Sequence, residues 1–133
     1  MKKIAILFVC LFSLSTYAQS LEVREINVGS EVEVSTQRLS YNFGRVWVNS
    51  MNIVRYWITN QGAAPLAREG FFVRGMFFEA YTDCPRVLAP AQRCNLEIRY
   101  WPAFEGFHSG RVEMQFIDKN DIIVDVYGNA ARM

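Results

Sequence analysis

From Leu21 onward, apolar and polar residues alternate with a period of two, in short stretches that recur about every ten residues. Clusters of Gly, Pro, Asn and Asp separate these stretches, which is the pattern of an all-β sandwich or barrel. No long window carries the stripe of an amphipathic helix. Eight strands are predicted: Leu21–Ile26, Glu31–Ser35, Arg45–Val48, Ile53–Thr59, Gly70–Arg74, Cys94–Trp101, Arg111–Phe116 and Ile122–Tyr127.

The alternation also assigns side chains to the two faces of each strand. In Cys94–Trp101, the charged Glu97 and Arg99 alternate with apolar residues, so the face of the strand that carries them is the solvent face. Trp101 lies on the same face. The same argument places Trp47 and Trp57 on the outward sides of their strands. Arg45 and Arg55, two residues before them, lie on the same sides. All three tryptophans are therefore predicted to point away from the core.

A leader precedes the alternating region. Lys2 and Lys3 are followed by an apolar run, Ile4–Leu14, and then by small and polar residues up to Ala18. This order is that of a secretory signal peptide, so we predict a leader at residues 1–18 and a periplasmic or secreted mature chain.

Two alternatives to a cleaved leader are weaker. A permanent anchor needs about 18 to 20 apolar residues, which the run does not reach, so no membrane span is expected in the mature chain. Lipid attachment at Cys10 is disfavoured because Phe8 and Val9 are bulkier than the small residues that such a site requires.

Charge and length limit the function classes. The sequence has 14 Lys plus Arg and 13 Asp plus Glu, and loss of the two leader lysines leaves 12 against 13, a net charge near −1. No basic field is expected that would hold nucleic acid or anionic lipid. The mature chain, about 115 residues, has the length of one domain.

The sequence offers no catalytic group or cofactor site. His108, the single histidine, lies in the stretch EGFHSG, and Ser109 beside it cannot reach base-to-nucleophile geometry by adjacency, so a solvated turn histidine is expected. The segment Asp118–Asp121 lacks the glycine and glutamate of a calcium loop and is predicted to be a plain turn. We expect a protein that is not an enzyme and holds no metal or cofactor.

Cys84 and Cys94 are the cysteines of the predicted mature chain. Tetrahedral zinc needs four ligands, and the mature chain offers two thiols and one imidazole. A redox pair usually has Cys-x-x-Cys spacing, whereas nine residues intervene here. In an exported protein, a pair of cysteines is most simply a disulfide, and we predict one.

Five blocks of the sequence resemble, in the correct order, the bacterial choice-of-anchor D domain. That family is related to the Hydin-type and abnormal-spindle-type immunoglobulin-like modules. The blocks are YNFGRVWVNS (41–50), YWITNQGAAPL (56–66), CPRVLAPAQRCNLEIRYWP (84–102), EGFHSGRVEMQF (105–116) and VDVYGNA (124–130). Asn49 and Ala91 stand where the family usually has Gly, which bears on turn geometry because Asn tolerates positive φ better than Ala.

The resemblance implies an immunoglobulin-like antiparallel β-sandwich of seven or eight strands without catalytic residues. It also implies a disulfide at these two cysteines and core positions at Phe71, Val73, Phe78, Val112, Met114 and Phe116. We divide the chain into a signal peptide (1–18), an N-terminal strand segment (19–40), the sandwich (41–130) and a short tail (131–133).

In the resembled fold, the strands that carry the three tryptophans tend to share one region of one sheet. We therefore predict a single aromatic and cationic binding face, because Trp and Arg are typical of interaction hot spots. Its members are Trp47, Trp57, Trp101, Arg45, Arg55 and Arg99. The alternative is that residues 19–40 lie across this face or lengthen the sheet.

These inferences describe a non-catalytic, exported binding or structural module of the cell envelope or the extracellular space. Its expected partner is another envelope or surface protein, with self-association included, and a glycan is the weaker alternative. The alternative function is an accessory subunit or chaperone of a surface assembly.

Overall fold

The computed structural model describes residues 21–25, 33–34, 38–117 and 121–132, and side chains are described from residue 38 onward. These residues form ten strands: β1 (Leu21–Glu25), β2 (Glu33–Val34), β3 (Arg38–Trp47), β4 (Asn52–Asn60), β5 (Leu66–Arg74), β6 (Phe78–Thr82), β7 (Val87–Leu88), β8 (Arg93–Tyr100), β9 (Gly106–Phe116) and β10 (Ile122–Ala131). The predicted turn at 118–120 lies outside the described residues.

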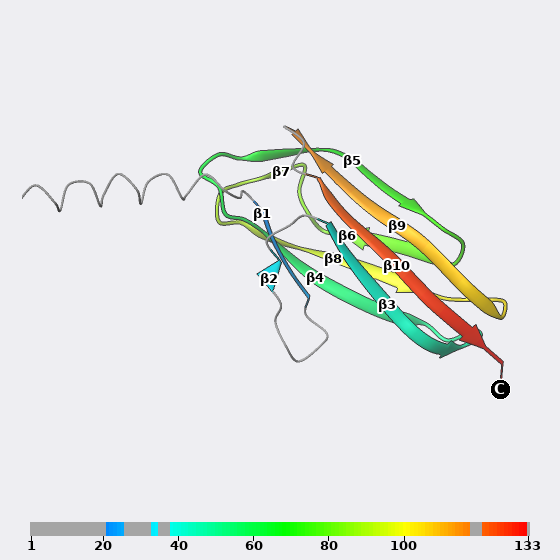
Figure 1. The fold of residues 1–133 in the computed structure, drawn as a ribbon. Helices are drawn as coiled ribbons and strands as arrows, with labels where there is room; N and C mark the ends of the chain where they lie inside the picture. Colours follow the sequence, from blue (N-terminus) through cyan, green and yellow to red (C-terminus); the bar gives the residue numbers. More distant parts are fainter. Residues whose placement is uncertain (1–20, 26–32, 35–37, 118–120, 133) are drawn as a thin grey trace, which may run out of the picture.

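The strands form two five-stranded sheets that pack face to face (Figure 1). The first sheet has the order β2-β1-β4-β8-β6, and the second has the order β3-β10-β9-β5-β7. The predicted β-sandwich is confirmed, with two differences. It has more strands than expected, and β3 runs parallel to its neighbour β10, whereas the other pairs are antiparallel.

The N-terminal strand pair lengthens the first sheet. β1 pairs with β4 along its whole length, from Leu21 opposite Asn60 to Glu25 opposite Tyr56. β2 adds outside β1. Of the two arrangements considered for residues 19–40, the described part of that segment therefore takes the sheet-lengthening one.

Alternation builds the core. The inward positions of β4, β8, β9 and β10 are buried, and the solvent-facing positions between them are not. Burying apolar side chains from both sheets against one another is the main stabilising term of such a sandwich. The central buried residues are Val54, Tyr56, Ile58, Leu96, Ile98, Tyr100, Val112, Met114, Phe116, Ile122, Val124 and Val126.

One expectation about packing needs correction, and two strands were missed. Val73 is exposed rather than in the core, because β5 is an edge strand at this position: β7 pairs with β5 only at Leu66 and Ala67. In the short strand β7, Val87 is exposed and its neighbour Leu88 is fully buried. The two short strands β6 and β7 were not predicted. The adjacent residues Phe77 and Phe78 obscure the apolar–polar alternation at the start of β6, and β7 has only two residues, too few to show any alternation.

Tyr100 joins the two sheets. Its buried ring stacks on Phe78 of the neighbouring strand at a centroid distance of 4.7 Å and contacts Phe43 of the opposite sheet at 5.5 Å. Gly128 of β10 faces the same ring, and a Cβ atom there would lie 2.1 Å from Tyr100 Cε2. Glycine is therefore required at 128 by the close approach of the two sheets.

Asn60 organises the end of the sandwich that holds the cysteine loop. Its buried side chain donates hydrogen bonds to the carbonyl oxygens of Ala64 and Leu88, both 2.9 Å, and accepts one from Gly62 N. Its backbone oxygen accepts from Ala91 N at 2.7 Å. This buried amide is fully bonded, which satisfies the requirement for burying a polar group.

Both positions where the resembled family has Gly adopt left-handed backbone. Asn49 has φ of 69° and Ala91 has φ of 67°. Asn occupies this region at little cost, whereas Ala meets a steric penalty of about 1 to 2 kcal/mol. The expectation that these substitutions bear on turn geometry is consistent with the structure.

We expect Gly128→Ala to lower the free energy of unfolding by about 3 kcal/mol, because the new methyl group clashes with a ring that cannot move. Gly44→Ala is the control. Gly44 also has a positive φ, 75°, but a Cβ atom added there would meet no atom within 4 Å. Alanine at this position therefore costs only the roughly 1 kcal/mol of a left-handed backbone. Urea denaturation measures both, and equal losses would contradict the packing account.

Ala91→Gly should stabilise the protein by about 1 kcal/mol, because glycine relieves the left-handed strain. Ala89→Gly, in the same loop but without positive φ, should instead lower stability by about 0.5 kcal/mol through unfolded-state entropy. Thermal and urea unfolding of the two variants check the opposite signs.

Candidate functional site

Cys84 and Cys94 form a disulfide, as predicted. Cys84 lies in the loop after β6 and Cys94 lies in β8, and both are almost completely buried. Asp83 lies near the two sulfur atoms, but its carboxylate accepts hydrogen bonds from Asn95 N and Nδ2 at 2.6 and 3.2 Å. Sulfur atoms joined to each other offer no thiolate to a metal, so this group of atoms serves as a staple.

The six residues of the predicted binding face do not share one sheet. Arg45 and Trp47 lie on β3 in the second sheet, whereas Arg55 and Trp57 lie on β4 in the first. The prediction of one sheet face is wrong because β3 pairs with β10, a long-range contact that alternation cannot reveal. The tryptophans do point outward, but they divide between a sheet face and one end of the sandwich.

The outward face of the first sheet holds paired charges and aromatic rings. Glu97 accepts a hydrogen bond from Arg55 Nε at 2.9 Å and another from Arg99. The Arg99 guanidinium lies over the ring of Tyr81, 4.4 Å from its centroid. Because Arg99 and Arg55 outweigh the opposing effect of burial, the pKa of Glu97 is lowered from its usual value.

Trp57 belongs to this same face but is half-buried. The Arg93 guanidinium lies 4.9 Å from the centre of its ring, a cation–π geometry. The polar and aromatic groups of this face therefore bind one another. An incoming partner would have to break these contacts before it gained new ones.

The opposite end of the sandwich from β2 exposes large apolar side chains. They lie on four neighbouring segments: the end of β3 and its turn, the turn after β5, the loop after β8 and the start of β9. Between 42% and 67% of each side chain is exposed. We call this surface the apolar end, and its members are Trp47, Met51, Met76, Trp101, Phe104 and Phe107.

Three hydrogen bonds tie the loops of the apolar end together. Trp101 N donates to Phe77 O at 2.9 Å, and its ring Nε1 donates to Asn49 O at 3.1 Å. Asn49 N donates to Pro102 O at 2.7 Å. The turns after β3 and β5 are thus both fixed to the Trp101–Pro102 segment.

Left-handed backbone accompanies these bonds. Phe77 has φ of 73° and Asn49 has φ of 69°. For a bulky residue such as Phe77, this conformation costs of order 1 to 3 kcal/mol and persists only where surrounding contacts impose it. The apolar end is therefore a built surface with a defined conformation.

An aromatic chain connects the apolar end to the core. Exposed Phe104 contacts Phe77 at 5.7 Å, and Phe77 contacts the His108 ring at 4.9 Å. His108 Nδ1 is hydrogen-bonded to the hydroxyl of buried Tyr100, and burial raises the pKa of that hydroxyl. The expectation of a solvated turn histidine is wrong, because His108 lies within β9 on its inward side.

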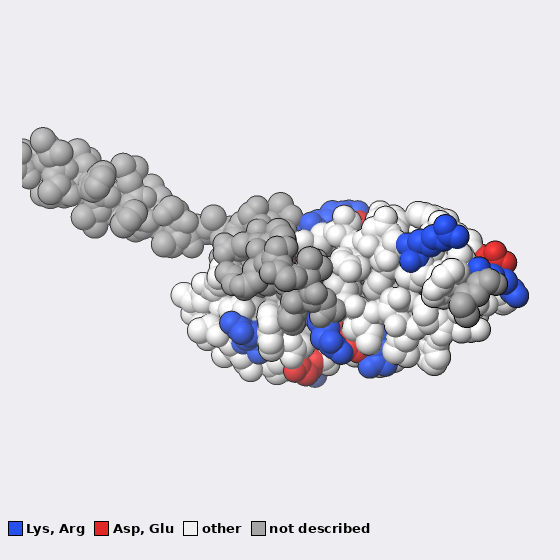
Figure 2. Space-filling view, turned by 90° about the horizontal axis from the view of Figure 1, so that it is seen from below, with Lys and Arg blue, Asp and Glu red and all other residues white. Residues whose placement is uncertain are grey.

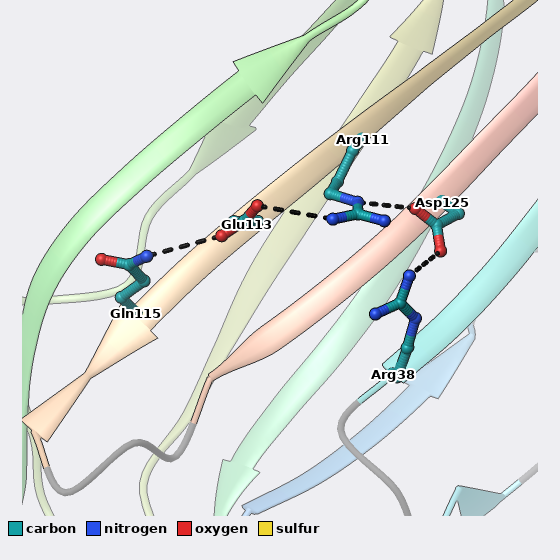
Figure 3. Close-up of polar contacts among 5 residues, drawn as sticks. All are labelled: Arg38, Arg111, Glu113, Gln115 and Asp125. Carbon is teal, nitrogen blue, oxygen red and sulfur yellow. Dashed lines mark hydrogen bonds and ion pairs between the residues drawn. The ribbon is translucent and has the colours of Figure 1, made fainter.

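The outward face of the second sheet carries a ladder of polar contacts (Figure 3). Asp125 accepts from Arg111 Nε at 2.8 Å and from Arg38 at 3.1 Å, while Arg111 also approaches Glu113 and Gln115 donates to Glu113 at 3.4 Å. Burial alone would raise the pKa of Asp125, but the two arginines hold it below its usual value. These groups neutralise one another.

Charged groups of both signs are scattered among uncharged atoms on the described surface seen from below (Figure 2). No continuous field of one sign is visible on that side. Within the residues that the structure describes, no helix has the length and apolar character that a membrane crossing requires.

Comparison of the sequence with protein-family models and with curated proteins gives no match. Solved structures do match. The ASH / PapD-like domain 7 of human CEP192 aligns with a TM-score of 0.56 and 13% identity, over 87% of this chain and 88% of that one.

Two bacterial structures match similarly. A Porphyromonas gingivalis W83 protein of unknown function aligns with a TM-score of 0.57 and 15% identity, over 84% of this chain and 48% of that one. The secreted serine protease VesC from Vibrio cholerae gives 0.54 and 18%, over 67% of this chain, which spans only 21% of the protease. At these identities the likeness shows the fold alone, a β-sandwich.

Sequence reasoning found two members of the apolar end, Trp47 and Trp101, from alternation. It missed Met51, Met76, Phe104 and Phe107, which lie in or beside loops where no period assigns a direction. An available signal was the concentration of large apolar residues beside Pro and Gly in the stretch 101–107, a composition unusual for a solvated loop.

We expect acid to destabilise the wild type more than Glu97→Gln. The folded-state pKa of Glu97 is lowered, so its contribution is complete above the unfolded value of about 4.3 and is lost as pH falls through the folded value. Urea unfolding at pH 7 and pH 3 measures this difference. Glu79→Gln is the control for loss of an exposed carboxylate, and an equal acid response in both variants would refute the prediction.

Proposed function

We propose that this protein is an exported, non-catalytic binding module of the cell envelope or the extracellular space. We further propose that it belongs to the choice-of-anchor D group of immunoglobulin-like domains. The five resembling sequence blocks and the PapD-like sandwich support this membership. The predicted leader and the disulfide, a bond typical of oxidising compartments, support export.

The observation that carries the binding function is the apolar end. Exposed large apolar groups gathered in one place are uncommon on soluble domains and mark interaction sites. Here the loops that bear them are fixed by hydrogen bonds through Trp101 and Asn49, and Phe77 is held in a strained conformation. Such preorganisation lowers the entropy cost of binding.

The two sheet faces are weaker candidates for the binding surface. On each, the charged groups are already paired, as Glu97 is with Arg55 and Arg99, and Asp125 with Arg111 and Arg38. Contacts of this kind at the surface keep a sheet soluble and contribute little to affinity. We therefore assign partner binding to the apolar end.

The double variant Phe104→Ser, Phe107→Ser should reduce binding of the mature protein to an isolated envelope fraction by about tenfold or more. Each serine removes a large apolar contact, and central hot-spot residues typically contribute at least 1.4 kcal/mol, or about tenfold. Co-sedimentation of labelled protein with the fraction measures the bound amount.

Two controls locate the site. Val87→Ser removes an equally exposed apolar side chain from the other end of the sandwich and should leave binding unchanged. Trp57→Ser tests the face of the first sheet and should also retain binding. If Trp57→Ser abolishes binding while the double variant does not, the site lies on the sheet face and the assignment to the apolar end is wrong.

A further inference from the structure

Strand β5 has an open edge over most of its length. β7 pairs with it only at residues 66–67 (Figure 1), and Arg68 N donates to Arg86 O at 2.7 Å. The described residues form no further backbone hydrogen bond on that side, whereas β9 pairs along the other side. Alternate backbone N–H and C=O groups of residues 70–74 therefore face outward and offer unused donors and acceptors to a further strand.

The side chains in the middle of this edge are apolar. Phe72 is 49% exposed and Val73, on the opposite face of the strand, is 37% exposed, while Phe71 is half-buried. Proteins usually protect an unpaired edge with charges, proline or a covering segment. Here the charged residues Glu69 and Arg74 stand only at the two ends, so the stretch between them can pair with an extended peptide.

A charged hollow lies beside the start of the open edge. Its volume is about 400 Å³, and it is lined by Arg68, Glu69, Gly70, Phe71 and Arg86. Among the described residues, neither the two arginines nor the glutamate takes part in an ion pair. Their net charge is +1 (2 − 1), so a single carboxylate would neutralise the hollow.

Strand direction connects the open edge to the hollow. β5 pairs antiparallel with both β7 and β9, and an antiparallel strand added along residues 70–74 would lie in line with β7. Such a strand ends at the hollow, because β5 itself begins there. The five residues of the edge span about 17 Å, at about 3.4 Å per residue, which is the length of a short chain end.

We infer that the open edge of β5 is a second binding site, separate from the apolar end, for the C-terminal segment of a partner protein. The segment adds to the sheet as an antiparallel strand and pairs with the backbone of residues 70–74. Phe72 and Val73 pack against its side chains. Arg68 and Arg86 hold its terminal carboxylate, for which arginine is well suited because it donates two hydrogen bonds at once.

Short peptides test the inference. The probe is a fluorescein-labelled hexapeptide of alternating threonine and valine with a free C-terminus, and fluorescence anisotropy should show saturable binding to the mature protein. The same peptide with an amidated C-terminus should bind about tenfold more weakly, because the charge-assisted hydrogen bonds are lost. A peptide with proline in place of each threonine keeps the carboxylate but lacks backbone N–H groups, so it should not bind.

A further peptide separates the two sources of a carboxylate. An amidated hexapeptide with aspartate as its last residue should bind as weakly as the amidated parent. If it binds as tightly as the peptide with a free C-terminus, the hollow takes a side-chain carboxylate and the assignment to a chain end is wrong.

Protein variants locate the site. Arg68→Gln, Arg86→Gln should weaken binding of the free-carboxylate peptide about tenfold and leave that of the amidated peptide unchanged. Arg93→Gln, which alters an exposed arginine of the other sheet, should change neither.

Two results would overturn the inference. One is equal binding of the free-carboxylate, amidated and proline peptides. The other is a dimer, seen by sedimentation, that Val73→Lys dissociates by placing a charge in the edge, since a second copy of the chain would then occupy β5.

Discussion

The packing of one buried ring, that of Tyr100, determines how the two sheets meet. Tyr100 is the last residue of β8, and its ring contacts Phe78 in its own sheet and Phe43 in the other. Gly128 allows β10 to approach the ring, and Nδ1 of His108 on β9 is hydrogen-bonded to the Tyr100 hydroxyl. The core is closed at this end by a cluster of rings from both sheets, with Tyr100 at its centre.

The same residue positions the apolar end. The chain leaves Tyr100 directly into Trp101 and Pro102, whose backbone and ring bonds hold the neighbouring turns. Phe77 is part of both arrangements, since it contacts His108 below and Phe104 above. Surface geometry at this end is thus a continuation of core packing, which explains how exposed apolar side chains stand in a fixed arrangement.

The two ends of the sandwich differ in how they are stabilised. One end has the Cys84–Cys94 disulfide and the buried amide of Asn60, which hold the loops there by covalent and polar bonds. The other end has no cysteine among its described residues and depends on aromatic contacts and strained turns. An end held by a disulfide and hydrogen bonds needs few apolar side chains and so exposes little apolar surface to a partner. An end held by aromatic contacts leaves parts of its apolar side chains exposed.

The sequence by itself determined the β-sandwich class, the inward set of β4, β8, β9 and β10, the outward direction of the tryptophans and the disulfide pair. These follow from period-two alternation and from cysteine number, which are local properties of the chain. Only the tertiary structure decided that Trp47 lies in a different sheet from Trp57, that His108 turns inward to Tyr100, and that loop residues such as Phe104 gather beside Trp101. Strand pairing and loop contacts join residues far apart in the chain, and alternation within one strand carries no information about which strand lies next to it.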